Sequence, residues 1–267
     1  MNRRHLRLGL IVAVLPLLAA CGGKKGEEEA TQSGKILKFE SYTYDMVAQI
    51  QGDTAVYAPG SNLVRFSGEG VLPSDIGDND IRLLRDTLMK ISGIVYADEY
   101  TPGPNLPEGM TVTELNPDTT QACGYVNNML SATMVNPRVV VFENTRDSYP
   151  CMAAHGMSSV SYVNYNVDKG RIVRLGYLFN DDYKGKLLKL IRDRITADKV
   201  PLVDGIKSVG ISDQFAITSD GLTFSYDPYE IAPYSEGVVT VRIPLGDLME
   251  AGILNDNGRS LLTGSPM

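Results

Sequence analysis

The sequence lacks the residues on which several common classes of enzyme depend. It has no Trp and only two His in 267 residues, and one of these, His5, lies close to the N-terminus. A catalytic zinc normally draws on several His, Cys or carboxylate ligands. A Ser-His-Asp hydrolase needs a nucleophile elbow, and no Gly-x-Ser-x-Gly motif is present. No Gly-rich loop of the P-loop or dinucleotide type occurs either. The sequence therefore gives no reason to assign a catalytic residue, a metal or a cofactor, and we expect a protein that is not an enzyme.

Basic residues are also scarce, with 25 Lys and Arg against 32 Asp and Glu. Removal of residues 1–20 would take away three Arg and no acid, so Lys and Arg would fall to 22 and the formal charge would become −10. Nucleic acids and anionic membrane surfaces attract basic patches. The charge balance therefore argues against both as partners and permits a cationic protein.

The N-terminal hydrophobic run, Leu8–Leu18, is too short to span a bilayer core of about 30 Å as a helix. Three Arg precede it, and Leu18-Ala19-Ala20-Cys21 follows it, which is the arrangement of a bacterial lipoprotein signal peptide. We predict a signal peptide at residues 1–20, cleavage before Cys21, and attachment to a membrane through lipid on Cys21.

Residues 21–34 contain no apolar side chain able to form a core, so we predict a flexible tether there. Gly22 occupies the position where an Asp would resemble an inner-membrane retention signal. We therefore expect an outer-membrane lipoprotein, facing either the periplasm or the cell surface. The run Glu27-Glu28-Glu29 resembles surface-export tags but also suits a solvated spacer.

Hydrophobic patterning in the remaining chain predicts an α+β fold, with antiparallel hairpins packed against two or three helices. Helical spacing marks 80–91 and 181–195, with a short helix at 245–251 and a weaker candidate at 122–134. Alternation or continuous apolar runs predict strands at 35–39, 110–115, 138–142, 158–167, 171–175, 215–217, 222–226 and 238–243. We divide this part into an N-terminal α+β region at 35–147, a C-terminal region at 148–254 and a polar tail at 255–267.

The chain from Tyr149 onward resembles a known family, the RsiV-like C-terminal domain, a domain of unknown function. The resemblance rests on Tyr149, on Ala154-His155-Gly156 and on the run Pro228-Tyr229-Glu230-Ile231-Ala232-Pro233-Tyr234. Such domains occur in a lysozyme-sensing anti-sigma factor and beside peptidoglycan deacetylases. The resemblance implies a lysozyme-like protein or a cell-wall glycan as ligand. The loop Pro150-Cys151-Met152-Ala153 departs from the glycine-rich family pattern.

Two cysteines, Cys123 and Cys151, would remain in the mature domain besides Cys21. An even pair in an exported protein is the usual sign of a disulfide. Two buried thiols, or a reactive Cys151 helped by His155 four residues later, are the alternatives.

Five residues are candidates for ligand binding: His155, Tyr226, Tyr229, Glu230 and Tyr234. Exposed tyrosines beside carboxylates suit recognition of protein or sugar. The same segment would suit a structural role, in which Pro228 and Pro233 bend an edge and the tyrosines pack beneath it. Asp227 and Glu230 would be the carboxylates of a glycoside hydrolase if they stood at a catalytic separation. We predict a lipid-anchored envelope binding protein; a carboxylate-dependent cell-wall hydrolase and a structural envelope lipoprotein are the alternatives.

Overall fold

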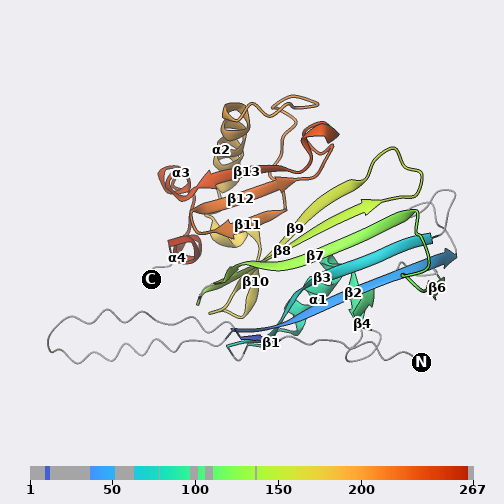
Figure 1. The fold of residues 1–267 in the computed structure, drawn as a ribbon. Helices are drawn as coiled ribbons and strands as arrows, with labels where there is room; N and C mark the ends of the chain where they lie inside the picture. Colours follow the sequence, from blue (N-terminus) through green and yellow to red (C-terminus); the bar gives the residue numbers. More distant parts are fainter. Residues whose placement is uncertain are drawn as a thin grey trace, which may run out of the picture.

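The computed structural model describes residues 10–12, 37–51, 63–77, 79–96, 102–105, 111–135 and 137–263. The predicted tether and Cys21 lie outside these residues, as does most of the predicted signal peptide. Within them, strands form one large sheet, one three-stranded sheet and a small two-stranded pair (Figure 1). Four α-helices accompany them in the described part of the chain. The α+β class is confirmed.

The large sheet has eight strands in the order β1-β2-β3-β7-β8-β9-β10, with β6 also paired to β2. All of these pairings are antiparallel except β3 with β7, which is parallel. The strands are β1 (Leu10–Val12), β2 (Leu37–Gln51), β3 (Leu63–Ile76), β6 (Thr111–Leu115), β7 (Gly124–Val135), β8 (Val139–Tyr149), β9 (Met157–Asn166) and β10 (Arg171–Val173).

The strand β8 explains why the sequence has a continuous apolar run at residues 138–142. Successive side chains of a strand point to opposite faces of the sheet. Val139 and Val141 belong to one hydrophobic core, whereas Val140 and Phe142 belong to a second core on the other face. Both faces of the sheet are therefore covered at this point, and the four side chains from Val139 to Phe142 are all buried.

One of these two cores lies beneath α1 (Arg82–Ile91), which buries Leu84 and Leu88 at helical spacing. A short strand pair, β4 (Ile94–Tyr96) with β5 (Pro102–Pro104), follows the helix. The buried Asn144 of β8 donates its side-chain N–H to the carbonyl of Ile91, 3.1 Å away. This bond satisfies a carbonyl at the helix C-terminus that has no partner within the helix.

The other core lies beneath the C-terminal elements, which form a three-stranded antiparallel sheet with helices around it (Figure 1). The helix α2 buries Leu187, Ile191 and Ile195 at intervals of four residues. The elements are η1 (Leu175–Leu178), α2 (Tyr183–Ala197), β11 (Phe215–Thr218), β12 (Gly221–Tyr226), η2 (Tyr234–Glu236), β13 (Val239–Pro244), α3 (Leu245–Glu250) and α4 (Asp256–Thr263).

Several side chains join the two sheets, and the buried Asn164 makes two of the hydrogen bonds between them. Asn164 on β9 donates its Nδ2–H to the carbonyl of Phe215 at 2.8 Å and accepts the N–H of Ile217 with Oδ1 at 2.7 Å. Both backbone groups belong to β11, the edge strand of the smaller sheet. Asn164 thus satisfies two edge groups that would otherwise be buried without partners.

The described elements differ from the sequence-based expectations in several places, of which three are the largest. Residues 124–135 form the strand β7, where a helix at 122–134 had been a weak expectation. The strand β3 was not anticipated, and residues 256–263 form α4, whose Leu261 and Leu262 are buried, rather than a polar tail. The proposed boundary at 147–148 falls within β8, so that elements on both sides of it share one sheet.

Candidate functional site

The connection between β8 and β9, residues 150–156, is fixed to the end of the large sheet. Cys151 forms a disulfide with Cys123, 28 residues earlier, just before β7. The predicted disulfide is confirmed. The hydroxyl of Tyr149 donates to the carbonyl oxygen of Ala153 at 2.7 Å. A covalent bond and a hydrogen bond therefore hold the first half of this connection.

His155, in the second half of the connection, contacts two tyrosines from the loop between β12 and β13. Its ring stacks on Tyr234 with centroids 4.0 Å apart, and its Nε2 lies 3.2 Å from the Tyr229 hydroxyl. Its Nδ1 lies 3.0 Å from the carbonyl oxygen of Gly156. Because a carbonyl only accepts, Nδ1 carries the proton in the neutral ring and Nε2 accepts from Tyr229. We call His155, Tyr229 and Tyr234 the aromatic triad.

Unusual backbone conformations occur beside the triad. Three non-glycine residues in the described chain have positive φ: Met152 (62°), Lys199 (56°) and Tyr229 (70°). Lys199 follows α2 in a helix-ending motif, in which Val200 N–H donates to the Ile195 carbonyl. The other two have no helix to end, and their side chains are 82% and 56% exposed. Such conformations cost about 1–3 kcal/mol each and occur preferentially at functional sites.

The remaining two candidates from the sequence do not join the triad. Tyr226 is only 1% exposed, and its hydroxyl donates to the Gly210 carbonyl at 2.9 Å. Burial raises the pKa of Tyr226 to about 12. Glu230 accepts the backbone N–H of Asp227 with Oε2 at 2.9 Å. Tyr226 is therefore a core residue, and Glu230 shapes the loop that presents Tyr229.

Sequence reasoning missed a second group of exposed side chains near the triad. Tyr125 on β7 stacks on Tyr149, with centroids 6.1 Å apart and planes 17° apart. Tyr125 and Met129 lie four residues apart on one face of β7 and are 45% and 42% exposed. Met157, at the start of β9, is 38% exposed. The alternation of β7 would have identified these outward positions if residues 122–134 had been read as a strand.

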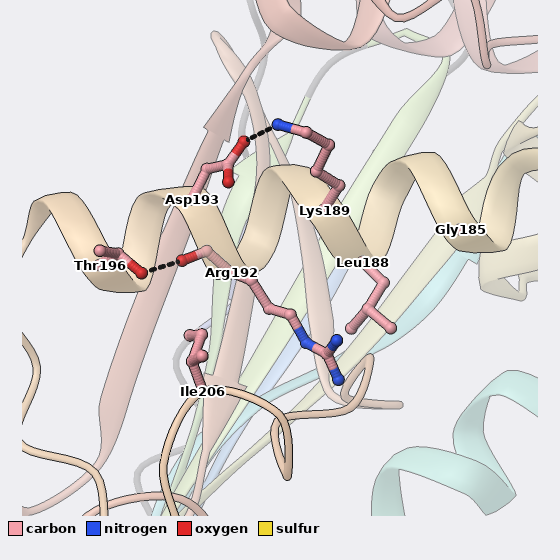
Figure 2. Close-up of a pocket in the computed structure, with 7 residues that line it drawn as sticks. All are labelled: Gly185, Leu188, Lys189, Arg192, Asp193, Thr196 and Ile206. Carbon is pink, nitrogen blue, oxygen red and sulfur yellow. Dashed lines mark hydrogen bonds and ion pairs between the residues drawn. The ribbon is translucent and has the colours of Figure 1, made fainter.

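A groove runs beside α2 and is lined mainly by side chains of that helix (Figure 2). Its volume is about 360 Å³. Arg192 points into it but donates to the carbonyls of Lys207 and Val209 at 2.8 and 2.7 Å. Lys189 pairs with Asp193 across one helical turn. The residues that line the groove are Gly185, Leu188, Lys189, Arg192, Asp193, Thr196 and Ile206.

Metal chemistry has no support in the described part of the chain, where no group of three or more His, Cys, Asp or Glu side chains could hold an ion. Among the same residues, none of the helices combines the length and the apolar character needed to cross a bilayer. The triad is thus the feature that combines two distant segments, exposed aromatic surface and strained backbone.

Comparison with known proteins finds one family that part of the chain resembles. The family described as a protein of unknown function (DUF3298) matches residues 177–246, which run from η1 to the start of α3 and include Tyr229 and Tyr234. No curated protein matches the sequence significantly.

Two solved structures share the fold. A DUF3298-family member from Bacteroides fragilis NCTC 9343 is 20% identical, with a TM-score of 0.57, over 87% of this chain and 99% of its own. A DUF3298-family protein from Pseudomonas aeruginosa PAO1 is 16% identical, with a TM-score of 0.52, over 81% of this chain and 95% of its own. Residues 177–246 of this chain are therefore similar to DUF3298, and the chain shares its fold with two proteins of that family.

Proposed function

We propose that this protein is a lipid-anchored envelope protein that binds a ligand through the aromatic triad and the surface around it. One observation carries the proposal: His155 and Tyr229 come from segments 74 residues apart and meet at an exposed surface, Tyr229 in a strained backbone conformation. Exposed tyrosines give large, rigid contact areas with a polar end, and they are enriched at binding interfaces.

The carboxylates of the same loop favour binding over hydrolysis. Asp227 accepts the N–H of Val160 with Oδ1 at 3.3 Å, and Glu230 accepts the N–H of Asp227. A glycosidase needs two carboxyl groups that face one substrate from a catalytic separation. Here each carboxylate is engaged with backbone, so both support a loop-shaping role.

The anchor follows from the sequence of the leader. Cleavage before Cys21 would remove Leu10–Val12, so β1 would be absent from the mature sheet. The mature chain would begin at Cys21 and run through the tether into β2. We place the protein in the outer membrane, and lipid on Cys21 is its link to the bilayer.

The resemblance to RsiV-like domains suggests the ligand class, a lysozyme-like protein or a cell-wall glycan. The triad favours a protein. Its rings stack on one another, His155 on Tyr234 at 4.0 Å and Tyr229 on Tyr234 at 5.7 Å, so their faces are partly covered and less available to a sugar. Glu230 and Glu236 add exposed negative charge to the loop, which suits a basic partner.

Calorimetry on residues 22–267 tests the proposal, with a hen-type lysozyme and peptidoglycan fragments as ligands at low and at physiological salt. We expect saturable binding that persists at physiological salt. Tyr229→Asn removes the ring while Asn tolerates positive φ, and it should weaken binding at least tenfold. Met249→Ala, at an exposed apolar site on α3, is the control and should bind normally.

Three other results would count against the proposal. Binding that disappears with salt would mean only charge attraction between an acidic and a basic protein. Equal binding by the Tyr229→Asn and control variants would move the site elsewhere. Absence of binding to both ligands would favour a structural envelope protein. The anchor is tested separately, by the mass of the mature N-terminus with and without Cys21→Ser.

A further inference from the structure

Three exposed cations stand close together at one end of the large sheet. Lys169 lies in the turn between β9 and β10, Arg171 begins β10, and Arg174 follows it. Among the described residues, no ion pair involves any of the three. The guanidinium of Arg171 lies 4.6 Å from the ring centroid of Tyr177, which holds the charge at the surface without neutralising it. We call these three residues the cationic turn.

The acids at this end of the sheet have partners of their own. Asp75 pairs with Lys38 at 3.0 Å, and Asp80 pairs with Arg82 at 2.6 Å. Asp168 also takes part in an interaction and is not free. With Asp168 counted, residues 168–174 hold three cations and one carboxylate, so this turn keeps a formal charge of +2.

The basic helix α2 behaves differently, although its sequence carries more cations. Three of its five basic residues form ion pairs with acids four residues away, and Arg192 is bound to backbone carbonyls. The pairs are Lys186 with Asp182, Lys189 with Asp193 and Arg194 with Asp198. Unpaired positive charge is thus concentrated at the turn rather than on the helix.

The cationic turn lies beside the point where the chain enters the domain. Leu37, the first residue of β2, pairs with Ile76 at the end of β3. The backbone N–H of Asn79 donates to the Ile76 carbonyl, and its side chain donates to the Val167 carbonyl at 2.8 Å. Gly170, inside the turn, packs against the Asn79 side chain. Figure 1 shows the start of β2 and the β9–β10 end of the sheet together at its lower left.

The aromatic triad lies at the other end of the same strands. The strand β8 begins at Val139, opposite Asn166 beside the turn, and ends at Tyr149, beside the disulfide. Its 11 residues span about 33 Å at the rise of an extended strand. At physiological salt, charges are screened within about 8–10 Å. The acidic groups near the triad therefore have little effect on an anion that approaches the cationic turn.

We propose that the cationic turn binds the anionic headgroups of the membrane to which the protein is anchored, so that the domain stands on this end and presents the triad away from the bilayer. The proposal rests on the anchor at Cys21. The predicted tether, residues 21–34, would have a root-mean-square reach of about 19–22 Å if it is flexible. Such a tether brings the entry end to the headgroups and imposes no orientation, so the charges decide which surface faces the lipid.

The net charge of −10 predicts repulsion from an anionic surface, whereas the placement of the charges predicts local attraction. A basic residue near an anionic membrane strengthens binding by about fivefold, so three give roughly a hundredfold. The test uses residues 22–267 without lipid, a form that keeps every described element except β1. Its binding is measured by sedimentation with vesicles of phosphatidylglycerol and phosphatidylcholine in equal parts, and with phosphatidylcholine alone.

We expect binding to the anionic vesicles, release by high salt, and none to the neutral ones. Lys169→Gln/Arg171→Gln/Arg174→Gln should weaken this binding roughly a hundredfold. The control Lys90→Gln/Lys184→Gln/Lys207→Gln changes the net charge equally at exposed sites on α1, α2 and the loop after α2, and it should bind as the wild type does.

Equal loss in both triple variants, or no binding by the wild type, would overturn the proposal. The outcome is independent of the ligand, because Tyr229→Asn should leave vesicle binding unchanged. It is also independent of lipidation, since the tested protein carries no lipid. A negative vesicle experiment would not affect the proposals for the triad and the anchor. A negative test of ligand binding or of the anchor would not change the vesicle result.

Discussion

Asn164 offers the sharpest test of how the two sheets are held together. Asn164→Leu keeps the approximate volume of the side chain but removes both of its hydrogen bonds to β11. The Phe215 carbonyl and the Ile217 N–H would then be buried without partners, at about 1–3 kcal/mol each. The added apolar surface offsets part of this cost. We expect the free energy of unfolding to fall by about 3 kcal/mol.

The matched control is Asn144→Leu on the neighbouring strand. Asn144 is as buried as Asn164, with both residues 2% exposed, but it makes one bond, to Ile91, and its Oδ1 has no partner. Leu would lose that bond and also remove the unpaired oxygen, so the two effects roughly cancel. We expect a change within about 1 kcal/mol.

Urea denaturation followed by circular dichroism measures both variants. A loss of 3 kcal/mol corresponds to a fall of roughly 6–12 °C in Tm for a domain of this size. If Asn164→Leu is no less stable than Asn144→Leu, the edge bonds of β11 are not what joins the sheets, and the reasoning fails. A changed denaturant slope would instead mean that the C-terminal sheet unfolds separately.

Three further predictions concern stability. Cys123→Ser/Cys151→Ser should lower the free energy of unfolding by about 3–4 kcal/mol, because the disulfide closes a loop across 28 residues, and reductant should reproduce the loss in the wild type. Burial raises the pKa of Tyr226 to about 12 from an unfolded value of about 10. The neutral hydroxyl therefore contributes fully to the free energy of unfolding below pH 10, and this contribution is lost as the pH rises to 12, at up to about 1.4 kcal/mol per pH unit. Tyr226→Phe should accordingly show a smaller fall in the urea midpoint at alkaline pH than the wild type does. Gly221→Ala should destabilise the protein by more than about 1 kcal/mol, because Gly221 has φ 150° and a Cβ there would overlap the backbone of β13. Gly185→Ala lies in open space on α2 and should stabilise the protein by about 0.5–1 kcal/mol. Thermal melts that rank the two variants in the opposite order would contradict this.

Two of the errors of sequence reasoning, on the strands β3 and β7, have a common physical cause. The strand β3 contains Gly68, Gly70 and Pro73, which are residue types that strands usually avoid. Gly68 is required because the ring of Tyr44 lies over it, where a Cβ would overlap the ring. This requirement comes from β2, which is distant in sequence, so the local pattern of β3 could not reveal it.

The strand β7 was ambiguous for a related reason. Its apolar residues fit helical spacing about as well as alternation, and short apolar runs are poor at separating the two. Pairing decided the outcome, with β3 parallel on one side and β8 antiparallel on the other. A strand between two partners satisfies its backbone groups through them, and this gain is not visible in residues 124–135 alone.

Features that depend on local order along the chain could be predicted from the residues alone. The α+β class, the helices α1 and α2, the β9–β10 and β11–β12 hairpins and the disulfide partners followed from periodicity, turn residues and cysteine number. The leader and Cys21 remain predictions from a linear motif. The candidate residues His155, Tyr229 and Tyr234 were recognised by their type and by family resemblance.

Which of these residues share a surface depends on the folded chain. It joined His155 to Tyr229 across 74 residues, buried Tyr226, and separated the cationic turn from the triad by the length of β8. Burial and proximity depend on contacts between distant segments, and a sequence records residue types without those contacts. The charge of the chain illustrates the difference, because composition fixes its sum and the fold alone fixes where each charge lies.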